Sequence, residues 1–498
     1  MLVPPRFRRR RQRIFLAAVL LGLLVVVAWF GRAAGPTPAS TSSPRTGQRP
    51  ATRVRPDDSV SPRECPPEVE ALRGSYLDLT QTIVYTRRCI QAVWVPDEVD
   101  RRRIARLREP LVTPGRTVNL TSCRLADLPP CEPLSLRVSR PPPSRTYPHL
   151  LFGVSTTSDR LQAAMPAFSH WLAGTDAKLV AVVYDEQAPA SAGGKSLAGL
   201  EEAFRGQDVR FTAVPPRNKT LSIAQNHFAI LADLLAAATP QTRWLGLVDD
   251  DTFFPSLFNL ARELDKHDHR RPAWLGALSE DDDAVARWGF MAYGGAGVFL
   301  SVPLARQLQP RIAACLDESR LGTGDVILGD CIGKHTTTKL TLVPGLYQHD
   351  LYGDLSGFYE SGVRPLSVHH YRGWYREPLP LMAAITRLCG DCFLQRWQFG
   401  DDTLFANGYS VTQYPGGLGG IDLGRMEATW SQPGHSFDRS MGRLRPRLDE
   451  SEKKSYRLKD VVVGENGSLR QIYVHRGDVG KDEMDEVVEL DWQVALPA

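Results

Sequence analysis

A chain of 498 residues is too long for one ordinary domain, and its length predicts two to four units. Its hydrophobic content of 42% and its charged content of 23% are typical of a globular protein. The net charge of +4 is small for this length, and a cluster of arginines within residues 6–13 carries much of the positive charge, which argues against a nucleic-acid-binding protein.

The first predicted element is a membrane anchor over residues 14–30, a run that contains no charged side chain. Its length is at the short end of the roughly 17 to 25 residues that span a bilayer as a helix. The basic tail over residues 1–13 then lies in the cytoplasm by the positive-inside rule, and the rest of the chain is lumenal. The alternative is a cleaved signal peptide, but the run is longer than the usual apolar core of about 7 to 15 residues. We therefore expect a single-pass type II protein of the Golgi or endoplasmic reticulum membrane.

Two segments of different composition follow the anchor. Residues 31–62 are rich in Pro, Ser, Thr and Arg without apolar periodicity, which predicts a flexible stem. Residues 63–145 hold four of the eight cysteines and two proline-rich stretches. For them we predict an irregular extension that is stapled by disulfides.

Sequons and cysteines agree with a lumenal address. Glycosylation sequons begin at Asn119, Asn218 and Asn466. Cys389 and Cys392 have the spacing of a redox or zinc half-site, but no second such pair accompanies them, so a local disulfide is the prediction.

Strands and helices alternate over residues 146–441. The segments expected at its start are a strand over 149–155, a helix over 160–172, a strand over 178–184 and a helix over 222–238. Ser222 and Gln225 form a capping box at the start of the last helix. This alternation predicts an α/β fold with a mainly parallel sheet that carries helices on both faces.

The last segment, residues 442–498, has three strand-like runs. They cover residues 460–463, 471–474 and 486–492. We predict a small β-rich addition to the preceding unit.

The most informative stretch is an apolar run that ends in three aspartates, Asp249, Asp250 and Asp251. Residues 252–264, directly after them, are expected to turn helical, because leucines at 257, 260 and 264 have spacings of three and four and Pro255 suits a first helical turn. Carboxylates at the carboxyl end of a strand in an α/β sheet lie where ligands bind. Their hard oxygen atoms suit Mg²⁺ or Mn²⁺, which can hold a diphosphate.

Two glycine-containing motifs follow the aspartates. The first is Gly294-Gly295-Ala296-Gly297 before a strand-like run, where closely spaced glycines let backbone approach a ligand. The second places Asp325 after a glycine turn at the start of a helix-like run. An aspartate there is either a simple helix cap or a general base that accepts a proton from a hydroxyl nucleophile. Cys315 and Cys331 flank this loop, and a disulfide between them would hold it.

Histidines complete the set. His349 follows shortly, and His369 and His370 lie beyond it. A histidine can complete a metal site that carboxylates begin.

The order of these motifs over residues 147–376 resembles the Fringe-like and β-1,3-galactosyltransferase-related glycosyltransferases of family 31, with the closer likeness to their fungal and plant Fringe-like branch. The resemblance implies a GT-A-like, Rossmann-type mixed sheet with helices on both faces. It also implies an inverting transfer of GlcNAc, Gal or Glc from a UDP-sugar to a hydroxyl of a glycan or glycoprotein, with Mn²⁺ as the cofactor.

The resemblance assigns roles to individual residues. Asp251 and His349 would bind Mn²⁺, and Asp325 would be the catalytic base. The donor-binding residues would be Asp249, Asp250, Thr156, Thr157, Asp185, Gly294, Gly295, Ala296 and Gly297.

Two departures from the family pattern leave alternatives open. The family segment before the base is usually Pro-Asp-Asp, whereas this chain has Thr323-Gly324-Asp325. The residues after His349 also differ, so His369 or His370 is an alternative metal ligand.

Two other functions compete with the transferase. A catalytically inactive lumenal glycan-binding protein on the same scaffold is the alternative. A metal-dependent phosphohydrolase usually needs a second set of ligands, which the sequence does not offer. A rival triplet at residues 281–283 follows another apolar run, and we expect it to be a solvated acidic loop near the acceptor cleft.

Overall fold

The structure is a computed structural model that describes residues 66–74, 76–95, 99–122, 128, 130–140, 146–184, 196–430, 436–464 and 467–496. The chain divides into two compact units, residues 1–59 and 60–498, and all described residues belong to the second. The predicted tail, anchor and stem lie outside the described residues. Among the residues that are described, no helix combines the length and the apolar character needed to cross a bilayer.

The first of two sheets has seven strands in the order β11-β9-β10-β8-β5-β6-β7. Their bounds are β5 Leu150–Thr157, β6 Lys178–Tyr184, β7 Arg210–Val214, β8 Trp244–Leu247, β9 Trp274–Gly276, β10 Val298–Ser301 and β11 Leu340–Leu342. Strands β5 to β8 run parallel to one another where they pair, whereas β10 runs antiparallel to both β8 and β9. The sheet is therefore mixed, and its parallel half carries the ends of β5 and β8 to the same edge.

Helices cover both faces of this sheet, as predicted. Along β5 and β6 successive side chains alternate between two separate apolar clusters, because neighbouring side chains of a strand point to opposite faces. On one face pack α3 Ser158–Leu172, α4 Leu197–Arg205 and α7 Leu257–Leu264. On the other pack α5 Ile223–Ala229, α6 Leu231–Ala237, α9 Val302–Leu308 and α11 Gly324–His335.

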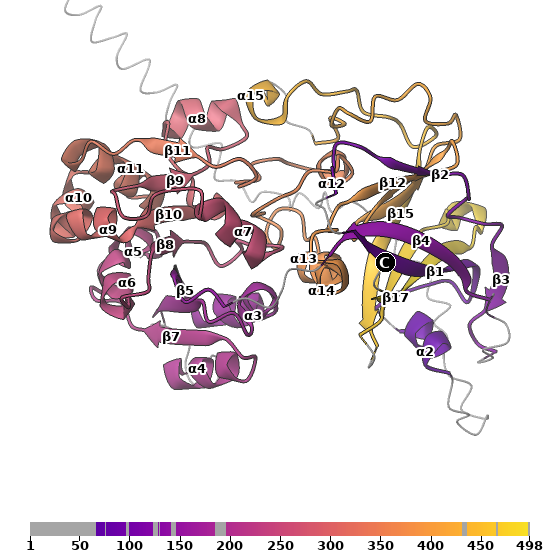
Figure 1. Cartoon of the computed structure of the whole chain (residues 1–498), viewed down its shortest axis with the longest axis horizontal. Helices are drawn as coiled ribbons and strands as arrows, with labels where there is room; N and C mark the ends of the chain where they lie inside the picture. Colours follow the sequence, from indigo (N-terminus) through magenta and orange to yellow (C-terminus); the bar gives the residue numbers. More distant parts are fainter. Residues whose placement is uncertain are drawn as a thin grey trace, which may run out of the picture. The chain divides into compact units, whose positions relative to one another are not determined.

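The second sheet has ten strands, in the order β2-β12-β13-β14-β15-β16-β17-β1-β3, with β4 pairing with β1 off this path. Their bounds are β1 Thr82–Val95, β2 Ala105–Leu107, β3 Arg116–Asn119, β4 Glu132–Ser139, β12 Arg396–Phe399, β13 Thr403–Ala406, β14 Ser410–Gln413, β15 Lys454–Val463, β16 Leu469–His475 and β17 Asp485–Leu496. Figure 1 shows indigo β1 and β4 next to yellow β17, so the two ends of the described chain share one sheet.

This sheet corrects the prediction of an irregular extension over residues 63–145. Strand β1 pairs in parallel with β17 and with β4, and the Cys89–Cys131 disulfide ties β1 to the start of β4. The predicted boundary after residue 441 also falls inside the sheet, because β14 pairs with β15 across it. The last segment is therefore not a separate addition but completes a sheet begun at the N-terminal side.

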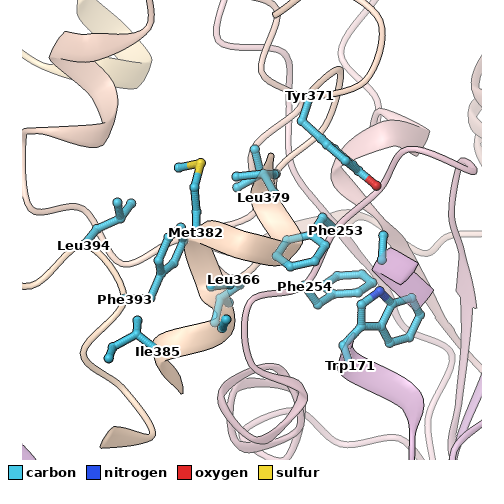
Figure 2. Close-up of a cluster of buried hydrophobic side chains, with 14 of the residues drawn as sticks. Trp171, Phe253, Phe254, Leu366, Tyr371, Leu379, Met382, Ile385, Phe393 and Leu394 are labelled. Atoms are coloured by element: carbon cyan, nitrogen blue, oxygen red, sulfur yellow. The ribbon is translucent and has the colours of Figure 1, made fainter. Parts of the chain in front are cut away.

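Short helices connect the two sheets. The described helices not yet named are α2 Pro67–Arg73, α8 Asp282–Trp288, α10 Ile312–Glu318, α12 Ser356–Tyr359, α13 Leu379–Met382, α14 Thr386–Cys389 and α15 Asp438–Met441. The 3-10 turns are η2 Gly294–Ala296, η3 Gln309–Arg311, η4 Ala383–Ile385 and η5 Val479–Lys481. One apolar cluster contains side chains from both sheets, Phe152 of β5 and Trp492 of β17 among them. In Figure 2, Trp171 and Phe254 lie on one side of this cluster, and Met382 and Phe393 on the other. The connection is thus a continuous buried core.

Candidate metal and catalytic site

The aspartate triplet lies just beyond the carboxyl end of β8, beside the end of β5. Asp250 is buried, and its carboxylate accepts hydrogen bonds from the hydroxyl of Thr156 and from Nη2 of Arg160, the latter at 2.8 Å. Thr156 belongs to β5 and Arg160 to the first turn of α3. The parallel pairing of β5 with β8 brings these groups together.

Asp249 lies between two buried histidines. Its Oδ1 is 3.4 Å from Nδ1 of His227, and its Oδ2 is 3.4 Å from Nε2 of His369. Burial opposes ionisation of this carboxyl group, but the hydrogen bond from His369 and the charge of His227 outweigh burial and lower the pKa of Asp249. Asp249 is therefore a carboxylate that faces both histidines.

Asp251 and His369 form the centre of a candidate metal site. Nε2 of His369 lies 3.0 Å from Oδ1 of Asp251. Asp251, His369 and His370 offer ligand atoms that all lie within 4.8 Å of one another. In the described ranges the other such group contains the Cys89–Cys131 disulfide, whose sulfur atoms are already bonded.

The second ring nitrogen of His369 is held by the backbone. Nδ1 of His369 lies 3.1 Å from the carbonyl oxygen of Gln348, and a proton donated there leaves the Nε2 lone pair free for a metal ion. The side-chain oxygen of Gln348 accepts a hydrogen bond from the N–H of Ala296 at 2.9 Å. Carboxylate oxygens suit Mn²⁺ and Mg²⁺, and imidazole is the commonest protein metal ligand, so this donor set fits a divalent cation.

Without a metal ion the same geometry favours a proton on His369. Burial opposes the charged imidazolium, but hydrogen bonds to Asp249 and Asp251 outweigh burial and raise the pKa of His369 well above its usual value. The pKa of Asp251 is lowered in turn, because its hydrogen bond with His369 outweighs the burial that raises it. A metal ion at this position would replace that proton.

His349 lies in an aromatic pocket and is absent from this group of potential ligands. It is fully buried, and its ring meets Phe358, Tyr359 and Tyr375 edge-on. Its Nδ1 lies 3.4 Å from the carbonyl oxygen of His369, and its Nε2 has no hydrogen-bond partner within the described part of the chain. Burial lowers the pKa of His349 to about 3. The geometry therefore places His369 and His370 beside Asp251, whereas His349 packs among aromatic rings.

Asp325 occupies the first turn of α11 but does not cap it, because Thr323 holds the N-cap position. Its Oδ2 accepts a hydrogen bond from the N–H of Gly294 at 2.9 Å, and its Oδ1 lies 3.7 Å from Nε2 of His227. Burial and then the charge of Asp249 raise the pKa of Asp325, while His227 acts in the opposite direction. One quarter of the side chain remains exposed, so this hydrogen-bonded carboxylate can meet a substrate proton.

The glycine motif permits close approach to both functional groups. A Cβ on Gly294 would lie 2.5 Å from Oδ1 of Asp325, and a Cβ on Gly295 would overlap the ring of His369. Gly297 has a φ of +89°, a conformation that L side chains rarely adopt. The turn Gly294–Ala296 thus packs its backbone directly against the proposed base and the candidate metal ligand.

The remaining predicted donor-binding residues are Thr157 and Asp185. Thr157 caps α3 by accepting a hydrogen bond from the N–H of Arg160. Asp185 lies outside the described residues.

The rival triplet has a local structural role. Asp281 caps α8 through the N–H of Asp283, and Asp282 pairs with Arg439 at 2.7 Å. No residue of α8 is buried.

Three residues of the site were not anticipated: His227, Arg160 and Gln348. The capping box at Ser222 predicted the helix that carries His227, but nothing in the helical pattern distinguishes His227 from a packed core histidine. Arg160 and Gln348 contact the site through pairings that join segments far apart in the sequence.

A family model described as "Protein of unknown function, DUF604" matches residues 286–385. The match covers less than half of the chain. It includes the glycine motif, Asp325 and the three histidines at positions 349, 369 and 370, but not the aspartate triplet. The comparison with curated proteins gave no match.

Several solved structures of glycosyltransferases are similar to this chain at low identity. A mannosyltransferase from Pyrobaculum calidifontis, in complex with GDP-mannose and Mn²⁺, is 10% identical with a TM-score of 0.28, and the match covers 45% of this chain. The chain spans 63% of the length of that mannosyltransferase. Mouse xyloside xylosyltransferase 1 is 12% identical, with a TM-score of 0.27 and coverage of 40% of this chain and 85% of that one.

The galactosyltransferase LgtC, in complex with donor and acceptor sugar analogues, is 14% identical, with a TM-score of 0.26 and coverage of 39% and 73%. TM-scores this low establish neither a common fold nor a common activity. The case for a function therefore depends on the site itself.

Proposed function

We propose that the chain is a metal-dependent inverting glycosyltransferase that moves a sugar of the GlcNAc, Gal or Glc type from a UDP-sugar to a hydroxyl of a glycan or glycoprotein. One arrangement supports this function above all. A candidate metal group, Asp251 with His369 and His370, and a separate hydrogen-bonded carboxylate, Asp325, lie on either side of Asp249 and His227. The proposal that the donor nucleotide is UDP rests on the order of motifs in the sequence.

The chain's own residues supply the acid–base part of a single displacement. The acceptor oxygen bonds to the anomeric carbon while the bond from that carbon to the diphosphate breaks, and UDP leaves with the bonding electron pair. Asp325 accepts the proton of the acceptor hydroxyl, and its raised pKa makes the carboxylate a stronger base for that task. A bound Mn²⁺ would neutralise negative charge on the departing diphosphate.

The other residues position these groups. Thr156 and Arg160 fix Asp250, and the carbonyl of Gln348 orients His369. Arg160 is more than half exposed beside the triplet, so its guanidinium also offers positive charge to a phosphate group. We place the site in the Golgi or endoplasmic reticulum lumen, behind an anchor at residues 14–30. Three disulfides among the described residues and exposed sequon asparagines at 119 and 218 support that placement.

A soluble chain that starts near residue 63 tests the proposal. Incubation with a panel of UDP-sugars and Mn²⁺ should release UDP, and calorimetry should show UDP binding that requires the metal ion. Asp251→Ala and His369→Ala should each abolish metal-dependent UDP binding. Asp282→Ala, taken from the rival triplet, is the matched control and should bind UDP as the unchanged chain does. UDP binding without any turnover would instead favour the inactive glycan-binding protein.

A further inference from the structure

Three aromatic rings form a continuous stack that leads from the candidate metal group to solvent. The imidazole of His370 stacks on the indole of Trp374 with centroids 3.7 Å apart and planes within 10°. Trp374 also stacks on Tyr352, with centroids 4.2 Å apart and planes within 20°. Tyr352 is 42% exposed and Trp374 44% exposed, so the outer end of the stack presents aromatic surface to water.

The backbone around the stack is held firmly. The hydroxyl of Tyr375 has one proton to donate and faces the backbone carbonyl oxygens of both His349 and Leu351. It also accepts a hydrogen bond from the N–H of Leu351, which ties the segment before Tyr352 to the segment that carries Trp374. The N–H of Trp374 donates to the carbonyl of His370 at 3.0 Å, in a turn where His370 has a φ of +58°. These hydrogen bonds fix the two segments so that the exposed rings of Tyr352 and Trp374 meet. A chance contact between two surface side chains would not need such fixing.

Contacts at both ends of the stack locate it relative to the rest of the site. At the Tyr352 end, the N–H of Asp350 donates a hydrogen bond to Oε2 of Glu280 at 3.0 Å, in the segment that follows β9. The carboxylate of Asp350 also lies 3.2 Å from Nε2 of His370. At the Trp374 end, Nη1 of Arg372 donates to the carbonyl oxygen of Arg160 at 3.3 Å. The Tyr352 end is therefore held by the segment after β9, which β10 separates from β8 and β5 in the sheet.

We propose that Tyr352 and Trp374 form the acceptor platform, and that the acceptor is a saccharide whose pyranose ring lies on these rings. This inference rests on the proposed transferase function and adds the class of acceptor. A pyranose with equatorial hydroxyls has a face of C–H bonds, which matches the negative face of an aromatic ring. A sugar on Tyr352 and Trp374 would lie beside Asp350, whose carboxylate contacts His370 of the candidate metal group.

A nucleobase is the other flat group that could stack here. The donor's base is expected on the β5 side, where Thr156 and Thr157 end the strand, whereas the segment before Tyr352 contacts the residues after β9, so we assign the platform to the acceptor. The two occupants differ in a measurable way. Loss of an acceptor platform weakens saccharide binding, whereas loss of a base platform weakens UDP binding.

The test uses the soluble chain with cellobiose, N,N′-diacetylchitobiose and lactose as probes, in the presence and absence of Mn²⁺ and UDP. Binding is followed by saturation-transfer NMR and by titration. Tyr352→Ala removes the outer ring without touching His370, and it should weaken saccharide binding about tenfold, which corresponds to about 1.4 kcal/mol. Tyr352→Phe keeps the ring and should restore binding. Tyr76→Ala, at an exposed aromatic residue beside Asp460 in the ten-stranded sheet, is the matched control.

The outcomes separate the two proposals. Selective loss of saccharide binding in Tyr352→Ala, with metal-dependent UDP binding retained, supports the platform. The platform is overturned if none of the saccharides binds the unchanged chain, if Tyr352→Ala binds them equally well, or if this variant loses UDP binding to the same degree. Failure of the unchanged chain to bind UDP with Mn²⁺ would instead reject the transferase function, and saccharide binding without donor would still decide the platform.

Discussion

The environment of Asp325 balances opposite influences on one proton. Burial and Asp249 favour the protonated carboxyl, while His227 and the N–H of Gly294 favour the carboxylate. Asp325→Asn keeps the shape of the side chain but cannot accept the acceptor proton. We expect kcat to fall by about 10²- to 10⁴-fold, the usual contribution of a general base.

Binding gives the control for this variant. Calorimetry should show that Asp325→Asn binds UDP with Mn²⁺ as the unchanged chain does, because Asp325 is not in the candidate metal group. Initial rates of UDP release with a saccharide acceptor then measure the chemical step. Turnover that survives the substitution unaltered would mean that another group removes the proton.

The raised pKa of His369 predicts that metal binding depends on pH. Hydrogen bonds to Asp249 and Asp251 raise the pKa of His369, so near neutral pH the metal-free site holds a proton that the metal ion must displace. Affinity for Mn²⁺ should therefore rise with pH, by up to about tenfold per pH unit, until the pH passes the raised pKa. Below that pKa the proton competes, and binding weakens as the pH falls.

Calorimetry in buffers of different ionisation enthalpy measures the proton directly. At pH values below the raised pKa of His369, Mn²⁺ binding should release close to one proton per ion in the unchanged chain. A metal affinity that does not change as the pH approaches that pKa would place the ion away from His369.

At the scale of elements, the backbone of the turn Gly294–Ala296 packs against both the proposed base, Asp325, and the candidate metal ligand His369. Gly295→Ala should displace the His369 ring, because the new Cβ would overlap it. We expect this variant to lose most metal-dependent UDP binding while the fold persists. Gly333→Ala is the matched control, since a Cβ at this position in α11 meets nothing within 4 Å and alanine favours a helix by up to about 1 kcal/mol.

Circular dichroism and thermal unfolding of both glycine variants accompany the binding measurement. If Gly295→Ala binds Mn²⁺ and UDP normally, the close packing of this turn is not needed for the site.

Elements with local signals could be predicted from the sequence. The strand expected over 178–184 coincides with β6, and the helix expected within residues 252–264 ends with α7 at Leu264 but begins at Leu257, after Pro255. The capping box at Ser222 is present, although the helix that it begins breaks at Ile230 into α5 and α6. Each of these elements is specified by its own periodicity and caps.

Contacts between distant segments could not be predicted. His369 joins the triplet across more than a hundred residues, and its choice over His349 depends on how the chain turns between β11 and α13. Among the candidate ligands, sequence order alone left His349, His369 and His370 open. Only the folded arrangement distinguishes the histidine that faces Asp251 from the one among aromatic rings.

For the whole molecule, the ten-stranded sheet was the main feature that the sequence concealed. Strand β1 contains Arg87 and Arg88, which look like solvated residues in an irregular segment. In the structure Arg87 pairs with the buried Glu489 of β17 at 3.1 Å, and Arg88 pairs with Glu132 of β4 at 2.7 Å. A partner about 400 residues away leaves no signal in local periodicity. The Arg87–Glu489 ion pair therefore belongs to a strand whose partner β17 lies at the other end of the chain.

Because the ten-stranded sheet includes strands after residue 441, we predict that the chain cannot be shortened to end at that residue. Ending the chain at residue 441 removes β15, β16 and β17, which exposes the edges of β14 and β1 to other chains. It also removes Tyr456, Leu458, Tyr473 and Trp492 from the shared apolar core. Each large buried side chain contributes about 1.5–3 kcal/mol, so their combined loss is comparable with a typical net stability of about 5–15 kcal/mol.

We expect the chain of residues 63–441 to aggregate or to lack a cooperative unfolding transition, whereas residues 63–498 unfold cooperatively. Size-exclusion chromatography and thermal unfolding would measure the difference. The triplet, Asp325 and the histidines are all present in the shorter chain, so its loss of metal-dependent UDP binding would come from the missing sheet and not from missing site residues. A chain ending at residue 441 that stays monomeric and binds UDP with Mn²⁺ would show that the seven-stranded sheet folds without the ten-stranded one.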